Sequence, residues 1–141
     1  MAAPTIRTAA EAFAAVALAA VACDGELAAV EARCLRQQLE FRQPFCAMDD
    51  AAMATLLDRL LAILREAGWQ ALVAQAAPQL NAAQAETAFA VAAGLTLADH
   101  VESNSEHSFL EQLSAALQLT PQRTDTILEV VSLLNRDSLA S

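Results

Sequence analysis

The chain reads DDAAMATLLDRLLAILREAG at residues 49–68, and this stretch carries its clearest secondary-structure pattern. The large apolar residues recur at intervals of three and four, which is the spacing of one face of an α-helix. They are Met53, Leu56, Leu57, Leu60, Leu61 and Leu64. An Asp49-Asp50 cap at the start and Gly68 at the end are typical helix boundaries. The stretch therefore predicts an amphipathic α-helix.

Helical patterns extend on both sides of this segment. Before it, the predicted helices cover about Thr8–Cys23 and then run from the Asp24-Gly25 turn to about Phe41. After it, they cover Trp69–Ala76 (closed by Pro78), Asn81–Ala98 (capped with Gln84), Ser105–Leu117 with Phe109, Leu110 and Leu113 inward, and a segment that begins at Thr120-Pro121. The last helix has the apolar stripe Ile127, Val130, Val131 and Leu134. Because no segment alternates as a strand does, we predict an all-α, single compact domain of about seven helices over residues 1–141.

The overall charge of the chain restricts its partners. Eight basic and 17 acidic residues give a net charge of −9, and 56% of the 141 residues are hydrophobic. Such a chain repels nucleic acid and anionic lipid, so we expect neither nucleic-acid binding nor direct membrane insertion. The apolar run Ala12–Cys23 is too short to span a bilayer, and we interpret it as a buried first helix and not as a signal peptide.

The chain has three cysteines, Cys23, Cys34 and Cys46, which is an odd number, and it has no CxxC motif. This pattern predicts neither a disulfide framework nor a zinc ribbon. All three lie on or beside apolar helix faces, so we expect buried, reduced thiols. No nucleophile elbow, HExxH motif or phosphate-binding glycine loop is present, and we expect no enzymatic activity.

An acidic signature occurs twice in the chain. Asp24 is followed seven residues later by Glu31, and Asp99 is followed seven residues later by Glu106. Both positions shift by 75 residues between the copies, since 99 − 24 and 106 − 31 give the same number. The spacing indicates an internal repeat, with units at about 8–41 and 81–118 that form two pseudo-symmetric halves. We expect the four carboxylates to lie on one side of the domain.

Two interpretations of these acidic positions remain open. The first is structural: Asp24 caps the following helix, and Ser103-x-x-Glu106 forms a capping box. Glu31 has no such explanation, because Ala28 lies three residues before it.

The second interpretation is a divalent cation site made by Asp24, Glu31, Asp99 and Glu106. Carboxylates suit calcium, magnesium or manganese, and histidines would admit zinc. The weaker candidate ligands are Glu26, His100, Glu102 and His107.

The acidic loops resemble those of the tellurite-resistance TerB family, which is also similar to the N-terminal domain of the DjlA co-chaperones. The likeness is carried by Ala22-Cys23-Asp24-Gly25-Glu26 through Glu31, and by Leu97-Ala98-Asp99 through Glu106 with Phe109-Leu110-x-x-Leu113. Cys23 and His100-Val101 depart from the family pattern, and the likeness extends over most of residues 8–135.

The resemblance implies a seven-helix bacterial protein of the stress and tellurite-resistance system. It implies a cytoplasmic location, peripheral to the inner membrane through a partner in a membrane-associated complex, and a metal site in the acidic loops. Tellurite itself is an anion, and a net charge of −9 disfavours its direct capture. We therefore expect either a cation-responsive interaction module or a structural helical adaptor with a protein-binding surface, and a homodimer is compatible with both.

Overall fold

The computed structural model describes residues 5–22, 27–97 and 104–139, with side chains in the last range described from residue 107. Seven α-helices lie in these ranges, which contain no strand, so the predicted all-α fold is confirmed. Their bounds are α1 Ala9–Ala22, α2 Ala29–Glu40, α3 Asp50–Ala67, α4 Trp69–Ala76, α5 Ala82–Leu97, α6 Asn104–Ala116 and α7 Pro121–Leu134. Two short 3-10 helices cover Phe45–Ala47 and Ala77–Gln79.

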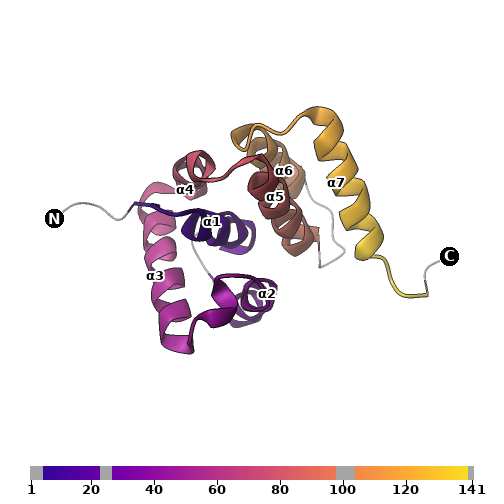
Figure 1. Cartoon of the computed structure of the whole chain (residues 1–141). Helices are drawn as coiled ribbons and strands as arrows, with labels where there is room; N and C mark the ends of the chain where they lie inside the picture. The colour runs from indigo at the N-terminus through magenta and orange to yellow at the C-terminus, as the bar shows by residue number, and fades with distance from the viewer. Residues whose placement is uncertain (1–4, 23–26, 98–103, 140–141) are drawn as a thin grey trace.

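Helix α1 lies at the centre of the molecule. It packs against α2, α3 and α4, and most extensively against α5, as Figure 1 shows. Many of its residues are alanines, whose small side chains allow neighbouring helices to approach closely. Because α1 is surrounded in this way, its apolar sequence forms a core helix, as predicted. None of the described helices is both long and apolar enough to cross a membrane.

The predicted helix ends are largely confirmed by their hydrogen bonds. Asp49 accepts a bond from the amide of Ala52 at 2.8 Å, which caps α3. Helix α3 ends at Gly68, whose φ of 88° is readily adopted only by glycine. The other predicted caps also form: Asn81 and Gln84 exchange side-chain to backbone bonds of 2.9 and 2.8 Å, and Thr120 accepts from the amide of Arg123 at 3.2 Å.

The 75-residue shift recurs in the positions of the helix ends. Helix α1 ends at Ala22 and α5 at Leu97, while α2 begins at Ala29 and α6 at Asn104; both differences (97 − 22 and 104 − 29) are 75. The packing follows the same correspondence, because α2 and α3 pack on α1, and α6 and α7 pack on α5. Helix α4 is the one described α-helix that falls outside this correspondence.

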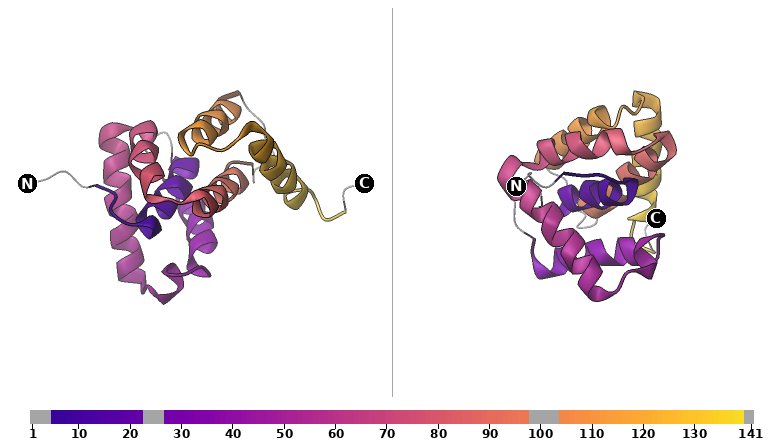
Figure 2. Two further views of the ribbon diagram at one scale, coloured as in Figure 1. Left: turned by 45° about the horizontal axis from the view of Figure 1, so that its top comes forward. Right: turned by 60° about the vertical axis from the view of Figure 1, so that its left-hand side comes forward.

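Helix α7 buries only part of its predicted apolar stripe. Val131 is buried and Ile127 is half-buried, but Val130 is 49% exposed and Leu134 is 77% exposed. The reason is the position of α7 at the outer edge of the molecule beyond α5, which Figure 2 shows. Only one side of α7 meets α5, so the rest of its apolar stripe is not covered by the described part of the chain.

Candidate functional site

Most of the predicted cation ligands lie outside the described residues. They are Asp24, Glu26, Asp99, His100 and Glu102. Glu106 belongs to α6, but its side chain also falls outside the described part. The expectation that four carboxylates lie on one side of the domain therefore stays a prediction.

Glu31 has a structural role that the sequence analysis missed. It is the third residue of α2, and its Oε1 accepts a hydrogen bond of 3.3 Å from the backbone amide of Ala28. The prediction that Glu31 has no capping explanation is wrong. An acidic residue at this position can reach back to the N-cap amide whatever the N-cap side chain is, so Ala28 does not prevent the bond.

The N-cap of α2 is Ala28, with φ −67° and ψ 154°. The helix therefore begins later than the Asp24-Gly25 turn suggested, and its N-cap residue is not Asp24, as the first of the two open interpretations would have it. The physical reason is that an N-cap residue must directly precede the first helical residue. The structure thus supplies a capping role for Glu31, whereas the side chain of Asp24 lies outside the described residues.

The histidine and cysteine predictions have different outcomes. His107 lies on the exposed side of α6. Cys34 and Cys46 are exposed free thiols, so the prediction that they are buried is wrong, and Cys23 lies outside the described residues. Cys34 is exposed because the neighbouring Leu35 points into the core, and one helical residue turns the next side chain by about 100°.

Among the described residues, no group of three or more His, Cys, Asp or Glu side chains could hold a metal ion. A described feature of another kind is an open groove of about 620 Å³ between α2, α5 and α7. Helix α5 forms its floor with Ala90, Val91, Gly94 and Leu95. Its walls are Cys34, Gln37, Gln38 and Arg42 on the side of α2, and Thr126, Ile127, Val130, Val131 and Leu134 on α7.

The floor of this groove is apolar but only partly covered. Helix α5 is apolar on nearly all sides from residue 88 onward, which is typical of a fully buried helix. Nevertheless Ala90, Gly94 and Leu95 are only half-buried. A Cβ atom built at Gly94 would meet nothing within 4 Å, so the space above the floor is open.

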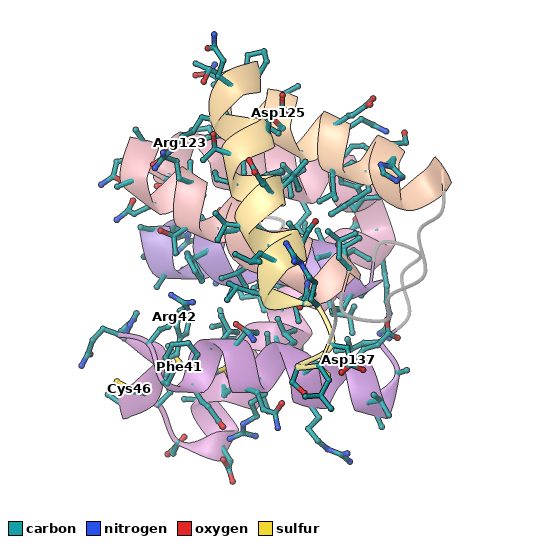
Figure 3. All side chains as sticks on the ribbon, turned by 90° about the vertical axis from the view of Figure 1, so that its right-hand side faces the viewer. Phe41, Arg42, Cys46, Arg123, Asp125 and Asp137 are labelled. Atoms are coloured by element: carbon teal, nitrogen blue, oxygen red, sulfur yellow. The ribbon has the colours of Figure 1, made fainter. Side chains whose placement is uncertain are left out.

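Among the described residues that line the groove, the charged ones are two arginines. Arg123 is paired, since its Nε lies 2.5 Å from Oε2 of Glu86. Arg42 donates from Nε to the carbonyl oxygen of Gln38 at 3.0 Å, and its guanidinium carbon lies 4.7 Å from the centre of the Phe41 ring. It forms no ion pair with a carboxylate of the described residues. Figure 3 shows Arg42 at the end of α2 and Arg123 on the opposite side of the opening.

A second groove, of about 570 Å³, adjoins the first at Arg42 and Thr87. Its apolar lining includes Phe13, Phe41 and Phe45. Arg42 is also the only charged residue among the described residues of its lining, so this guanidinium lies where the two apolar surfaces meet. Such an arrangement can bind an apolar surface and a carboxylate at the same time.

The sequence contained two signals for the groove between α2, α5 and α7. Gly94 interrupts an apolar helix, where glycine costs about 1 kcal/mol relative to alanine. The apolar character of α5 on nearly all sides is typical of complete burial, and the partial exposure of its residues marks the groove. Arg42 could not have been identified in this way, because its role depends on contacts between helices.

The chain matches no protein-family model, no curated protein and no solved structure. The likeness to TerB proteins therefore stays a prediction from the acidic motifs. Function has to be inferred from the geometry of the described residues, of which the groove between α2, α5 and α7 is the most informative part.

Proposed function

We propose that the chain is a non-enzymatic helical adaptor that binds another protein through the groove between α2, α5 and α7. The observation that carries this proposal is the partly exposed floor formed by α5, a helix whose composition suits complete burial. Open space above Gly94 and the exposed side chains of Val130 and Leu134 extend the same apolar surface. Contiguous exposed apolar surface is a feature of interaction sites.

The resemblance to TerB proteins supplies the setting of this proposal. It suggests a bacterial stress or tellurite-resistance system, in which the adaptor acts in the cytoplasm on a protein of a membrane-associated complex. The net charge of −9 supports protein partners over nucleic acid or anionic lipid.

A second candidate function is a response to a divalent cation through the acidic loops. Two observations favour it. The helix ends that flank both loops repeat with the same 75-residue shift, and Asp24 is not the N-cap of α2. In this form the adaptor would bind calcium, magnesium, manganese or zinc between its two halves.

Photo-crosslinking tests the adaptor proposal. A photoreactive phenylalanine analogue replaces Leu134 in the groove, and in the control variant it replaces Ala54, which is exposed on α3 and does not line the groove. In the cells that express the chain, we expect a discrete crosslinked protein from position 134 and none from position 54.

The crosslink from position 134 should disappear when Gly94→Met fills the floor of the groove. Equal crosslinking from both positions, or crosslinks that persist with Gly94→Met, would contradict a role of the groove in binding a protein.

A further inference from the structure

We infer that the groove between α2, α5 and α7 receives an acidic, amphipathic helix of the partner protein, seated as α4 is seated in the other half of this chain. The inference rests on the proposed adaptor function and specifies the chemistry of the partner. It follows from the internal correspondence of the helices and from the charges around Arg42.

The correspondence relates α1 to α5, α2 to α6 and α3 to α7. Helix α4 packs against α1, α3 and α6. Under the 75-residue correspondence these three helices become α5, α7 and α2, which are the helices that line the groove. The groove is therefore the counterpart of the place that α4 occupies.

Individual residues agree with this correspondence. Ala15 and Ala19 of α1 are completely buried, with exposures of 0%. A shift of 75 residues takes them to Ala90 and Gly94, which are only half-buried in the floor of the groove. A surface that is completely covered on α1 is therefore only partly covered on α5.

Helix α4 indicates what kind of helix fits. Its residues Trp69, Leu72, Val73 and Ala76 follow the i, i+3, i+4, i+7 pattern, and the last three are buried. Trp69 also contacts α6, since its ring centre lies 4.6 Å from that of Phe109. A partner helix of at least two turns with this spacing would cover the floor of the groove in the same manner.

The charges favour an acidic helix over a basic one. Arg42 has no carboxylate partner among the described residues, and none of the described residues that line the groove is acidic. A basic helix would be attracted by the net charge of −9, but salt screens that attraction beyond about 8–10 Å. At contact distance the charge of the Arg42 guanidinium matters more, because it forms stronger hydrogen bonds with a carboxylate than with a neutral acceptor.

Two synthetic helical peptides test this inference on the full chain. Each is capped, about 18 residues long so that it can form a helix, and repeats the apolar spacing of α4. One carries Glu at the flanking positions and the other carries Gln. Binding is measured by the fluorescence anisotropy of a dye attached to the peptide, at fixed ionic strength.

We expect the Glu peptide to bind about fivefold more tightly than the Gln peptide, which is a typical gain for one charged hydrogen bond. Arg42→Gln should reduce the affinity for the Glu peptide to that for the Gln peptide. Arg33→Gln, a control on α2 outside the groove, should leave the preference unchanged. Gly94→Met should lower the affinity for both peptides at least about tenfold, whereas Ala54→Met should lower the affinity for neither.

Three results would overturn the inference: no binding of either peptide, a preference for Gln, or binding that is insensitive to Gly94→Met. Sedimentation provides a further check, because a dimer that dissociates on Gly94→Met would show that a second copy fills the groove. If photo-crosslinking still captures a partner at position 134, the adaptor function stands and only the helix assignment fails. If that crosslink is absent, the adaptor function fails first.

Discussion

Substitution of Gly94 and substitution of Gly68 should have opposite effects on stability, because the surroundings of the two glycines differ. Gly94 lies inside α5 with open space where a Cβ would be, whereas Gly68 ends α3 with φ +88°. Alanine lowers the backbone entropy of the unfolded chain and suits a helix interior, but it is strained at a positive φ.

We therefore predict that Gly94→Ala raises the free energy of unfolding by about 0.5–1 kcal/mol, and that Gly68→Ala lowers it by about 1 kcal/mol or more. Urea denaturation of both variants measures the two changes. A destabilising Gly94→Ala would contradict the open space above the floor of the groove, and with it the reason for placing an occupant there.

Glu31 shows how one side chain separates the two interpretations of the acidic repeat. Its bond to the amide of Ala28 survives in Glu31→Gln, whose side-chain oxygen still accepts, but not in Glu31→Ala. We predict that Glu31→Ala costs about 1 kcal/mol in chelator, and that Glu31→Gln costs less than half of that. Thermal or urea unfolding measures both. A Glu31→Gln variant that is more stable than the parent would instead indicate repulsion between clustered carboxylates.

Two residues of the apolar stripe of α7 lie in different surroundings. Val131 is buried, and Leu134, three residues later, is 77% exposed. We predict that Val131→Ala lowers the free energy of unfolding by about 1–2 kcal/mol, because it leaves a cavity in the core, and that Leu134→Ala changes it by less than about 0.5 kcal/mol. Similar costs from both variants, measured by urea denaturation, would show that Leu134 is covered in solution.

The helices themselves could be predicted from the sequence, because capping and turn formation depend on residues close together in the chain. Asp49, Gly68 and Thr120 end or begin helices as expected. What the sequence could not supply is which side of each helix is covered. An apolar stripe such as Val130 and Leu134 predicts a contact surface, but the partner that covers it depends on packing between distant segments.

The candidate site, like the fold, could be predicted from the sequence only in part. The repeat of Asp24 and Asp99 was visible in the sequence, and the helix ends follow its 75-residue shift. The groove was not predicted, because it is formed by α2, α5 and α7 from separate parts of the chain. In the whole molecule, α4 packs on α1 in the first half. In the second half, the corresponding surface of α5 is only partly covered by the described part of the chain.

The two halves together also set the expected response to cations. If the loops form one site, a bound divalent cation stabilises the folded chain by RT ln(1 + [L]/Kd), about 2.7 kcal/mol at a hundredfold excess over Kd. We predict that at least one of calcium, magnesium, manganese and zinc raises the melting temperature above that in chelator at equal ionic strength. Sodium chloride serves as the control for general screening of the net charge of −9.

The double variant Asp24→Asn with Asp99→Asn identifies the source of that gain. Asparagine is as good an N-cap as aspartate, so the variant removes charge without removing any cap that these residues provide. We predict that it abolishes the cation-dependent rise and that, in chelator, it melts higher than the parent because repulsion between carboxylates is relieved. Thermal melts in chelator and in each cation measure both effects. If none of the four cations shifts the parent and the double variant melts no higher in chelator, the carboxylates do not converge and the adaptor acts without a cation.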